Sequence, residues 1–353
     1  MTIEQIRLDS FRNFDTWAHA FHPRVNAIIG PNGAGKTSIL ESIYMLGYGR
    51  SFRHRSSLPL IKHEHSTLII QAECLDQEQK YHMAIQKNHS NQNQLRENKA
   101  TIKSLSQFQY KPAICYMDSD LHRQYNRQST ERRKILDWGV FHHEPTYLSI
   151  WRRYQHTLKQ RNASLNQCYR SEDITIWDQG LSELASQIHQ YRSTYYKKLL
   201  PFLQSALEKI CHFSDEISLE YSPGWDTSLA LSDVLRQNFA LDKQVKSTTK
   251  GSHRADFNLL CHGKKISEYR SQGEQKLILY GLKLAQILLL LNERDQPIIV
   301  LIDDIIAEID LERQMKIIHF LKQLPLQLFF TCTHFDGLDT CISTSECKQI
   351  NLI

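Results

Sequence analysis

The chain of 353 residues carries 43 Lys and Arg against 38 Asp and Glu, a net charge of +5, and 41% of its residues are hydrophobic. This balance indicates a folded globular protein and excludes collagen-like, low-complexity and acidic disordered chains. The length predicts two or three structural units, with a core large enough to need no disulfides.

The first 110 residues contain short runs of alternating apolar residues, as at 25–29 and 67–72, which predict strands. A polar tract at 88–99, rich in Asn and Gln, predicts an exposed loop or hairpin tip. Residues 111–213 hold 15 basic and 10 acidic residues, whereas the rest of the chain is neutral. Apolar residues at helical spacing in this basic block predict a mainly helical lobe.

The sequence GPNGAGKT at 30–37 matches the G-x-x-x-x-G-K-[ST] pattern of a phosphate-binding loop, between a predicted strand at 25–29 and a predicted helix at 38–46. Its glycines let backbone N–H groups turn towards a polyphosphate, and the helix N-terminus adds its positive dipole end. Lys36 would reach the β- and γ-phosphates of ATP, and Thr37 would bind Mg²⁺. The predicted ATP-binding residues of this loop are Gly30, Asn32, Gly33, Gly35, Lys36, Thr37 and Ser38.

The run SQGEQK at 271–276 directly precedes a long apolar helix predicted at 277–291. Ser271 is a suitable N-cap for that helix, and this structural explanation stays open. The run also resembles the signature sequence of ABC-type ATPases, whose serine hydroxyl and helix N-terminus bind the γ-phosphate held by a second subunit. On that resemblance Ser271, Gly273 and Gln275 would act in trans.

The apolar run at 298–302 ends in two carboxylates and predicts a buried parallel strand, whose carboxyl edge is where α/β sheets bind ligands. We assign Asp303 to the Mg²⁺ shell. Asp304 and Lys36 are the candidate catalytic residues, and Asp304 would orient or deprotonate the attacking water. Asp310 resembles the D-loop that follows such strands. His334 is either a switch histidine or a surface residue that ends a strand.

Several stretches, in order along the whole chain, resemble the RecF family of bacterial DNA gap-repair proteins, which are related to SMC and Rad50 heads. They are LDSFRNF at 8–14, the phosphate-binding loop, and the segments 131–137, 141–147, 158–162, 251–256, 271–275 and 301–304. Ser252 and Ala255 depart from the family's Gly-Pro-His-Arg-Asp-Asp, and no Q-loop glutamine can be named. The resemblance implies an ABC-type α/β ATPase head at 1–110 and 214–353, a helical lobe at 111–213, and Arg12 as a further ATP contact.

The same resemblance implies a slow DNA-stimulated ATPase that forms homodimers on binding ATP and Mg²⁺. It implies binding to gapped, single-stranded and double-stranded DNA, and cooperation with RecR and RecO to load RecA in DNA repair, recombination and replication. The alternatives are an ABC ATPase subunit of a transporter, which would have a shorter head, and a Rad50-type tethering head. The absence of heptads speaks against the latter.

Four arginines of the basic block are the candidate DNA contacts, because a modest basic surface suits sequence-independent binding to phosphates. They are Arg132, Arg133, Arg152 and Arg153. Solvated helix faces or internal ion pairs, for example of Arg132 or Arg161, are the alternative explanation.

Eight cysteines are scattered singly, with no C-x-x-C pair and no zinc-like spacing. We therefore expect reduced, mostly buried thiols in a cytoplasmic protein. The N-terminus lacks a secretory signal pattern, and the longest apolar runs fall far short of the ~20 residues that cross a bilayer, so no membrane association is expected.

Overall fold

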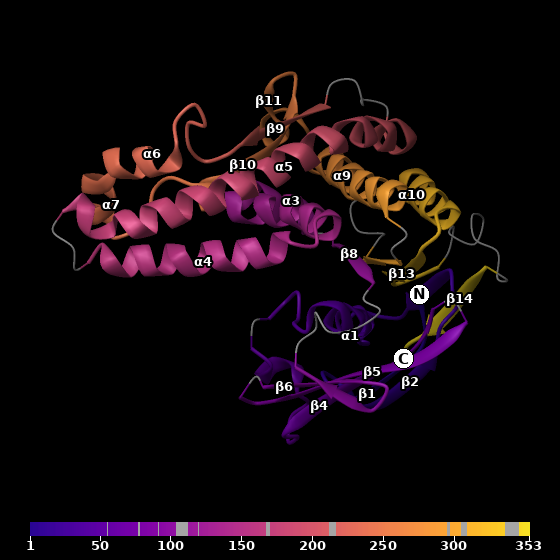
Figure 1. Ribbon diagram of the computed structural model, residues 1–353. Helices are drawn as coiled ribbons and strands as arrows, with labels where there is room; N and C mark the ends of the chain where they lie inside the picture. The colour runs from indigo at the N-terminus through magenta and orange to yellow at the C-terminus, as the bar shows by residue number, and fades with distance from the viewer. Residues whose placement is uncertain are drawn as a thin grey trace. The chain divides into compact units, whose positions relative to one another are not determined.

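The structure is a computed structural model, and its chain divides into two compact units, residues 1–119 with 295–353 and residues 120–294. Figure 1 traces the chain and its elements. The described residues are 1–54, 56–76, 78–90, 92–103, 112–118, 120–166, 170–211, 217–294, 297–304, 309–335 and 346–353.

The first unit contains an antiparallel sheet in the order β2-β1-β4-β5-β6-β7. Its strands are β1 (Thr2–Phe11), β2 (Phe14–Ala20), β4 (Thr67–Asp76), β5 (Gln79–Asn88), β6 (Asn93–Glu97) and β7 (Ala100–Ile102). Alternate residues of β4 and β5 are buried, as a sheet with one covered face requires. The tract at 88–99, expected to be an exposed loop or hairpin tip, is partly strand, because Asn88 ends β5 and residues 93–97 form β6.

The second sheet of this unit is parallel throughout, in the order β14-β3-β13-β12-β8. Its strands are β3 (Val25–Ile29), β8 (Ala113–Met117), β12 (Ile298–Ile302), β13 (Gln327–Cys332) and β14 (Cys347–Asn351), and its helices are α1 (Lys36–Tyr48) and α10 (Leu311–Gln323). Every residue of β12 and β13 is buried, as expected of central parallel strands. The α/β fold class is confirmed.

The second unit is mainly helical, with one small antiparallel sheet in the order β11-β10-β9. Its longer helices are α3 (Ser129–His143), α4 (Tyr147–Ser164), α5 (Thr175–Ile210) and α9 (Gln272–Glu293), and its shorter ones are α2 (Leu121–Arg127), α6 (Leu231–Gln237), α7 (Phe239–Val245) and α8 (Ile266–Tyr269). The strands are β9 (Ile217–Ser222), β10 (Asp256–Cys261) and β11 (Lys264–Lys265). The close approach of α3 to α5 depends on Gly139, where a Cβ would lie 2.0 Å from the Tyr195 hydroxyl oxygen.

The units differ from the expected boundaries at 110/111 and 213/214. Residues 214–294, expected in the head, belong to the second unit with the helical block. The physical reason is tertiary packing: α9, which carries the signature run, packs against α5, and β9 and β10 form a sheet beside the same helix. The change of composition at 213 therefore marks no boundary between units.

The six cysteines that the structure describes are buried and form no disulfide with one another, in agreement with the expectation of reduced thiols. Cys168 and Cys341 lie outside the described residues. Within the described part of the chain, no helix combines the length and apolarity that spanning a membrane requires.

Candidate nucleotide site

The phosphate-binding loop joins β3 to α1, as the motif predicts. Gly33 and Gly35 have φ angles of 87° and 101°, in the left-handed region that favours glycine. A Cβ on Gly35 would lie 2.6 Å from the Phe14 ring and 2.9 Å from the Asn13 amide nitrogen. The loop therefore packs directly on the turn after β1, which is a structural role for Asn13 and Phe14 that sequence analysis had not assigned.

Lys36 is buried, and its ammonium group turns back into the loop. Its Nζ donates hydrogen bonds to the carbonyl oxygens of Gly30, at 2.6 Å, and Pro31, at 3.0 Å. The side chain thus places a positive charge inside the ring of backbone that the loop forms. Such a charge in a glycine-rich loop at the N-terminus of a helix is suited to bind a polyphosphate.

Asp303 lies at the carboxyl end of β12, and one of its oxygens receives two hydroxyl hydrogen bonds. Thr37 donates at 3.0 Å and Thr331 at 2.8 Å. Burial raises the pKa of Asp303, while the hydrogen bonds from Thr331 and Thr37 and the nearby charge of Arg53 act in the opposite direction. The structure therefore joins the Thr37 hydroxyl to the Asp303 carboxylate, the two groups that the sequence assigned to Mg²⁺.

These two side chains fit Mg²⁺, which typically binds one or two protein oxygens, phosphate oxygens and water. In the described residues there is no group of three or more His, Cys, Asp and Glu side chains that could hold a metal by themselves. Any divalent cation at Thr37 and Asp303 would therefore need further ligands from a bound phosphate or from water.

Asp304 adopts φ of 53°, a left-handed conformation that Asp tolerates better than most residues. Its backbone N–H donates to the Thr331 hydroxyl oxygen at 2.7 Å. Thr331 therefore orients both carboxylate residues, a role that sequence analysis missed. The available signal was a hydroxyl residue near the carboxyl end of the apolar strand β13, which is adjacent to β12.

Arg12, expected to contact ATP, forms two hydrogen bonds with the buried carboxylate of Glu41, at 2.7 and 2.8 Å. It also donates to the carbonyl oxygen of Pro59 at 2.8 Å. Its role towards ATP stays a prediction, because the guanidinium is held by these partners in this structure. Arg53, by contrast, is exposed and influences Asp303 electrostatically, so it is a further cation near the site.

Ser271 is the N-cap of α9 and forms a complete capping box with Glu274. The side chain of Gln275 is held between the Asn126 amide, which donates to it at 2.6 Å, and the carbonyl oxygen of Arg270, which accepts from it at 2.6 Å. Ser271 and Gln272 are exposed, Gly273 and Glu274 are partly exposed, and Gln275 is buried. Ser271 therefore caps the helix, as the structural explanation predicts, and its side chain stays accessible to solvent.

Asp310 is exposed and caps α10 by accepting a hydrogen bond from the backbone N–H of Arg313 at 3.0 Å. The preceding residues 305–308 lie outside the described residues, so the predicted D-loop is described only at Asp310. His334 is exposed after β13, and its assignment as a switch histidine stays a prediction.

The four predicted DNA contacts fall into two groups. Arg132 pairs with Asp256 at 2.7 Å, and Arg133 donates to the carbonyl oxygen of Ala255 at 2.6 Å. Arg152 and Arg153 are exposed on α4 and line a groove of about 400 Å³ along α4 and α5. Internal contacts thus engage the first pair, whereas the second pair is open to a ligand.

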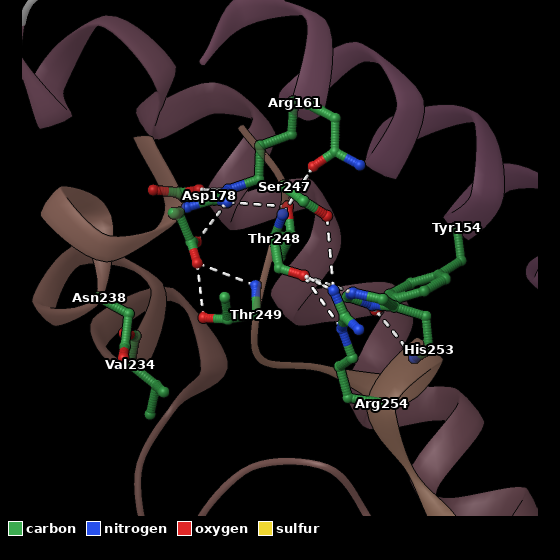
Figure 2. Close-up of polar contacts among 12 residues, drawn as sticks. Tyr154, Arg161, Asp178, Val234, Asn238, Ser247, Thr248, Thr249, His253 and Arg254 are labelled. Atoms are coloured by element: carbon green, nitrogen blue, oxygen red, sulfur yellow. Dashed lines mark hydrogen bonds and ion pairs between the residues drawn. The ribbon is translucent and has the colours of Figure 1, made fainter. Parts of the chain in front are cut away.

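Arg161 is fully buried in a polar network of the second unit (Figure 2). It forms ion pairs of 2.6 Å with both Asp178 and Asp242, and it donates to the Thr248 hydroxyl at 2.8 Å. Burial raises the pKa of Asp178 and outweighs the opposing effect of Arg161. The expected internal ion pair of Arg161 is confirmed.

The model of the RecF/RecN/SMC N-terminal domain matches residues 2–349. The chain is 33% identical to the DNA replication and repair protein RecF of Psychromonas ingrahamii, over 96% of this chain and 94% of that protein. It is 34% identical to RecF of Francisella tularensis, over 98% and 99% respectively. A solved structure of the recombination mediator protein RecF with ATP, in the RecFOR pathway, has a TM-score of 0.84 at 26% identity and covers 94% of this chain and 92% of that one.

Proposed function

Because the chain belongs to the RecF family, we propose that it is an ATP-dependent DNA-binding protein of recombinational gap repair. The observation that carries its ATP-dependent part is the group of hydrogen bonds that joins Thr37, Asp303 and Thr331, together with the Lys36 ammonium held inside the loop. The match to RecF supports the DNA-repair part. These groups supply the charges and hydroxyls that nucleotide hydrolysis requires. The test is ATPase activity without DNA and with gapped, single-stranded or duplex DNA, and we expect slow turnover that DNA stimulates.

Each residue of the site has a separate task in this proposal. The glycines of the loop and Lys36 bind the phosphates, and Thr37 and Asp303 hold Mg²⁺, which when bound neutralises phosphate charge. Thr331 keeps the Asp303 carboxylate oriented. Asp304 is the candidate to orient or deprotonate the attacking water, and the hydrogen bond from its N–H to Thr331 holds its backbone in place.

ATP is proposed to join two copies of the chain. The N-terminus of α9, with the exposed Ser271 and the partly exposed Gly273, would bind the γ-phosphate held by the loop of the other copy. Hydrolysis would remove that phosphate and release the two copies. The match of the chain to RecF over nearly its full length supports this arrangement over a transporter subunit or a Rad50-type tethering head.

Ser271→Arg is expected to leave ATP binding by the monomer nearly unchanged and to abolish the ATP-induced dimer, because a bulky cation would block close approach of a second copy. Fluorescent-ATP affinity and ATP-dependent mass, measured on one preparation, check this. If Ser271 serves only as an N-cap, the variant loses about 1 kcal/mol of stability and still dimerises. Ser271→Thr is the control for the cap, because Thr keeps the hydroxyl at the N-cap without adding a charge.

Arg152 and Arg153 are the proposed contacts with DNA phosphates. Replacing both with alanine should weaken binding to all sequences alike and make the slope of log affinity against log salt shallower by about 0.9 for each phosphate that the variant no longer binds. Salt titrations with gapped DNA, with and without ATP, measure this. The matched control is Lys134→Ala, which removes an exposed cation that Glu131 already neutralises at 2.7 Å. If the salt slope of the double variant equals that of the control, Arg152 and Arg153 do not contact DNA phosphates.

Cooperation with RecR and RecO, and the loading of RecA, belong to the same proposal, supported by the RecFOR pathway of the similar solved structure. Binding of purified RecR to this chain on gapped DNA with ATP would test it. We expect complex formation only with ATP, and a complex that forms equally without nucleotide would contradict the ATP-dependent part of the proposal.

A further inference from the structure

The segment 251–256, for which neither the sequence nor the nucleotide site provides a role, is held in place at almost every residue. Arg192 donates to the carbonyl oxygen of Ser252 at 2.8 Å, and the backbone N–H of Gly251 donates to the carbonyl oxygen of Gly224 at 3.1 Å. Further along, Arg133 holds the carbonyl oxygen of Ala255 and Arg132 holds the carboxylate of Asp256, as described above. Together these hydrogen bonds fix one conformation of the backbone.

His253 and Thr248 fix the middle of this segment (Figure 2). The Nε2 of His253 lies 2.9 Å from the carbonyl oxygen of Thr248, which can only accept, so Nε2 carries the hydrogen. Nδ1 is then the acceptor for the Tyr154 hydroxyl at 2.7 Å. Burial lowers the pKa of His253 to about 4, and the ring is therefore neutral near pH 7. The side chain of His253 consequently joins Tyr154 to the Thr248 carbonyl oxygen and has a structural role.

Arg254 is the exception, because its side chain is exposed. Its Nε and Nη2 donate to the Thr248 carbonyl oxygen at 3.2 and 3.1 Å, and Nη2 also lies 3.4 Å from the Ser247 hydroxyl. Its Nη1 makes no hydrogen bond with any described residue. The guanidinium is thus fixed along one edge and has donors free along the other, which reduces the entropic cost of binding a ligand.

The charges around Arg254 favour an anion. Lys246 and Lys250 are exposed on the same stretch of chain and have no ion pair with a described residue. The nearest acidic residues along the chain, Asp242 and Asp256, are each paired with an arginine. Residues 246–254 thus carry three exposed cations, Lys246, Lys250 and Arg254, and contain no acidic residue.

We propose that the segment 251–256 is a rigid support for Arg254, and that Arg254, with Lys250 and Lys246 beside it, contacts the phosphate backbone of DNA. A planar guanidinium held at one edge can present two donors to a phosphate, whereas a lysine presents a mobile point charge. This inference rests on the proposed DNA-binding function and adds Arg254, Lys250 and Lys246 to the candidate contacts Arg152 and Arg153.

The test compares Arg254→Ala, Arg254→Lys and the wild-type chain in salt titrations of gapped-DNA binding with ATP present. Arg254→Ala should lower the affinity about tenfold, the value for a charge-assisted hydrogen bond, and make the salt slope shallower by about 0.9. Arg254→Lys keeps the charge but cannot keep the fixed guanidinium, so its slope should match the wild type while its affinity is reduced. Lys134→Ala is again the control for removing a positive charge.

Three results would overturn the inference. The first is an Arg254→Ala variant with wild-type affinity and slope, which would leave the proposed DNA-binding function intact. The second is a lower melting temperature with an unchanged slope, which would make Arg254 a structural residue. The third is a wild-type chain that binds no DNA, which would remove the proposed function as well. Fluorescent-ATP affinity should be equal in all variants, because Arg254 is not part of the nucleotide site.

Discussion

Lys36→Ala is expected to lower the rate of ATP hydrolysis at least a hundredfold, on the order of the ~10²-fold effect of removing one preorganised electrostatic group in other enzymes. The buried ammonium is the positive charge that the structure places inside the phosphate-binding loop, and alanine cannot replace it. ATP hydrolysis, followed as phosphate release with DNA present, measures the effect. The melting temperature of the variant should change little, because Lys36 forms hydrogen bonds to backbone carbonyl oxygens but no ion pair with a described residue.

Two related variants make this result specific. Lys36→Arg keeps a charge but lacks the compact ammonium, so it should also be impaired in hydrolysis, with some ATP binding retained. Lys62→Ala is the matched control, since Lys62 is a partly exposed lysine of the same unit that pairs with Asp15. Wild-type turnover in Lys36→Ala would contradict the assignment of residues 30–37 as the phosphate-binding loop.

Arg161→Met is expected to lower the free energy of unfolding by about 3–5 kcal/mol, the usual cost of leaving a buried charge without its partner. Met retains the unbranched apolar part of the Arg side chain, so the main effect is electrostatic. Asp242 is fully buried and Asp178 nearly so, and each would be left without its ion pair to Arg161. Urea unfolding, followed by circular dichroism, measures the change.

Lys159→Met is the control for this prediction, because Lys159 is exposed on the same helix and should change stability by less than about 0.5 kcal/mol. A double variant, Arg161→Met with Asp242→Asn, distinguishes the effect of the unpaired carboxylate on stability from the effect of lost packing. If the uncompensated carboxylate causes the destabilisation, the double variant should be more stable than Arg161→Met alone. Equal stability of Arg161→Met and the wild type would contradict a structural role for the network in Figure 2.

The sequence by itself predicted two parts of the candidate nucleotide site that the structure contains, and their binding of nucleotide stays a prediction. A glycine-rich turn between a strand and a helix is defined by neighbouring residues, so the loop at 30–37 and the strand that ends at Asp303 were both recognisable. The sequence assigned Thr37 and Asp303 to Mg²⁺ separately, and the structure joins these residues, 266 positions apart, by a 3.0 Å hydrogen bond.

The contribution of Thr331 could not be read from the sequence. It depends on β13 lying between β3 and β12, and strand order in a parallel sheet is a property of the tertiary fold. The boundary of the helical unit could not be predicted from the sequence either. It depends on the packing of α9 on α5, which brings together residues about 80 positions apart, and composition does not reveal such contacts.

The arginines give the clearest division between what the sequence determined and what only the tertiary structure decided. The number of basic residues at 111–213 indicated a basic block, but Arg132, Arg152 and Arg161 within it, and Arg254 outside it, look alike in a sequence. The fold buries Arg161 between two carboxylates, pairs Arg132 with Asp256, and leaves Arg152 and Arg254 exposed. Burial and the distance to a carboxylate decide whether a guanidinium stabilises the fold or is available to a ligand, and both quantities exist only once the chain is folded.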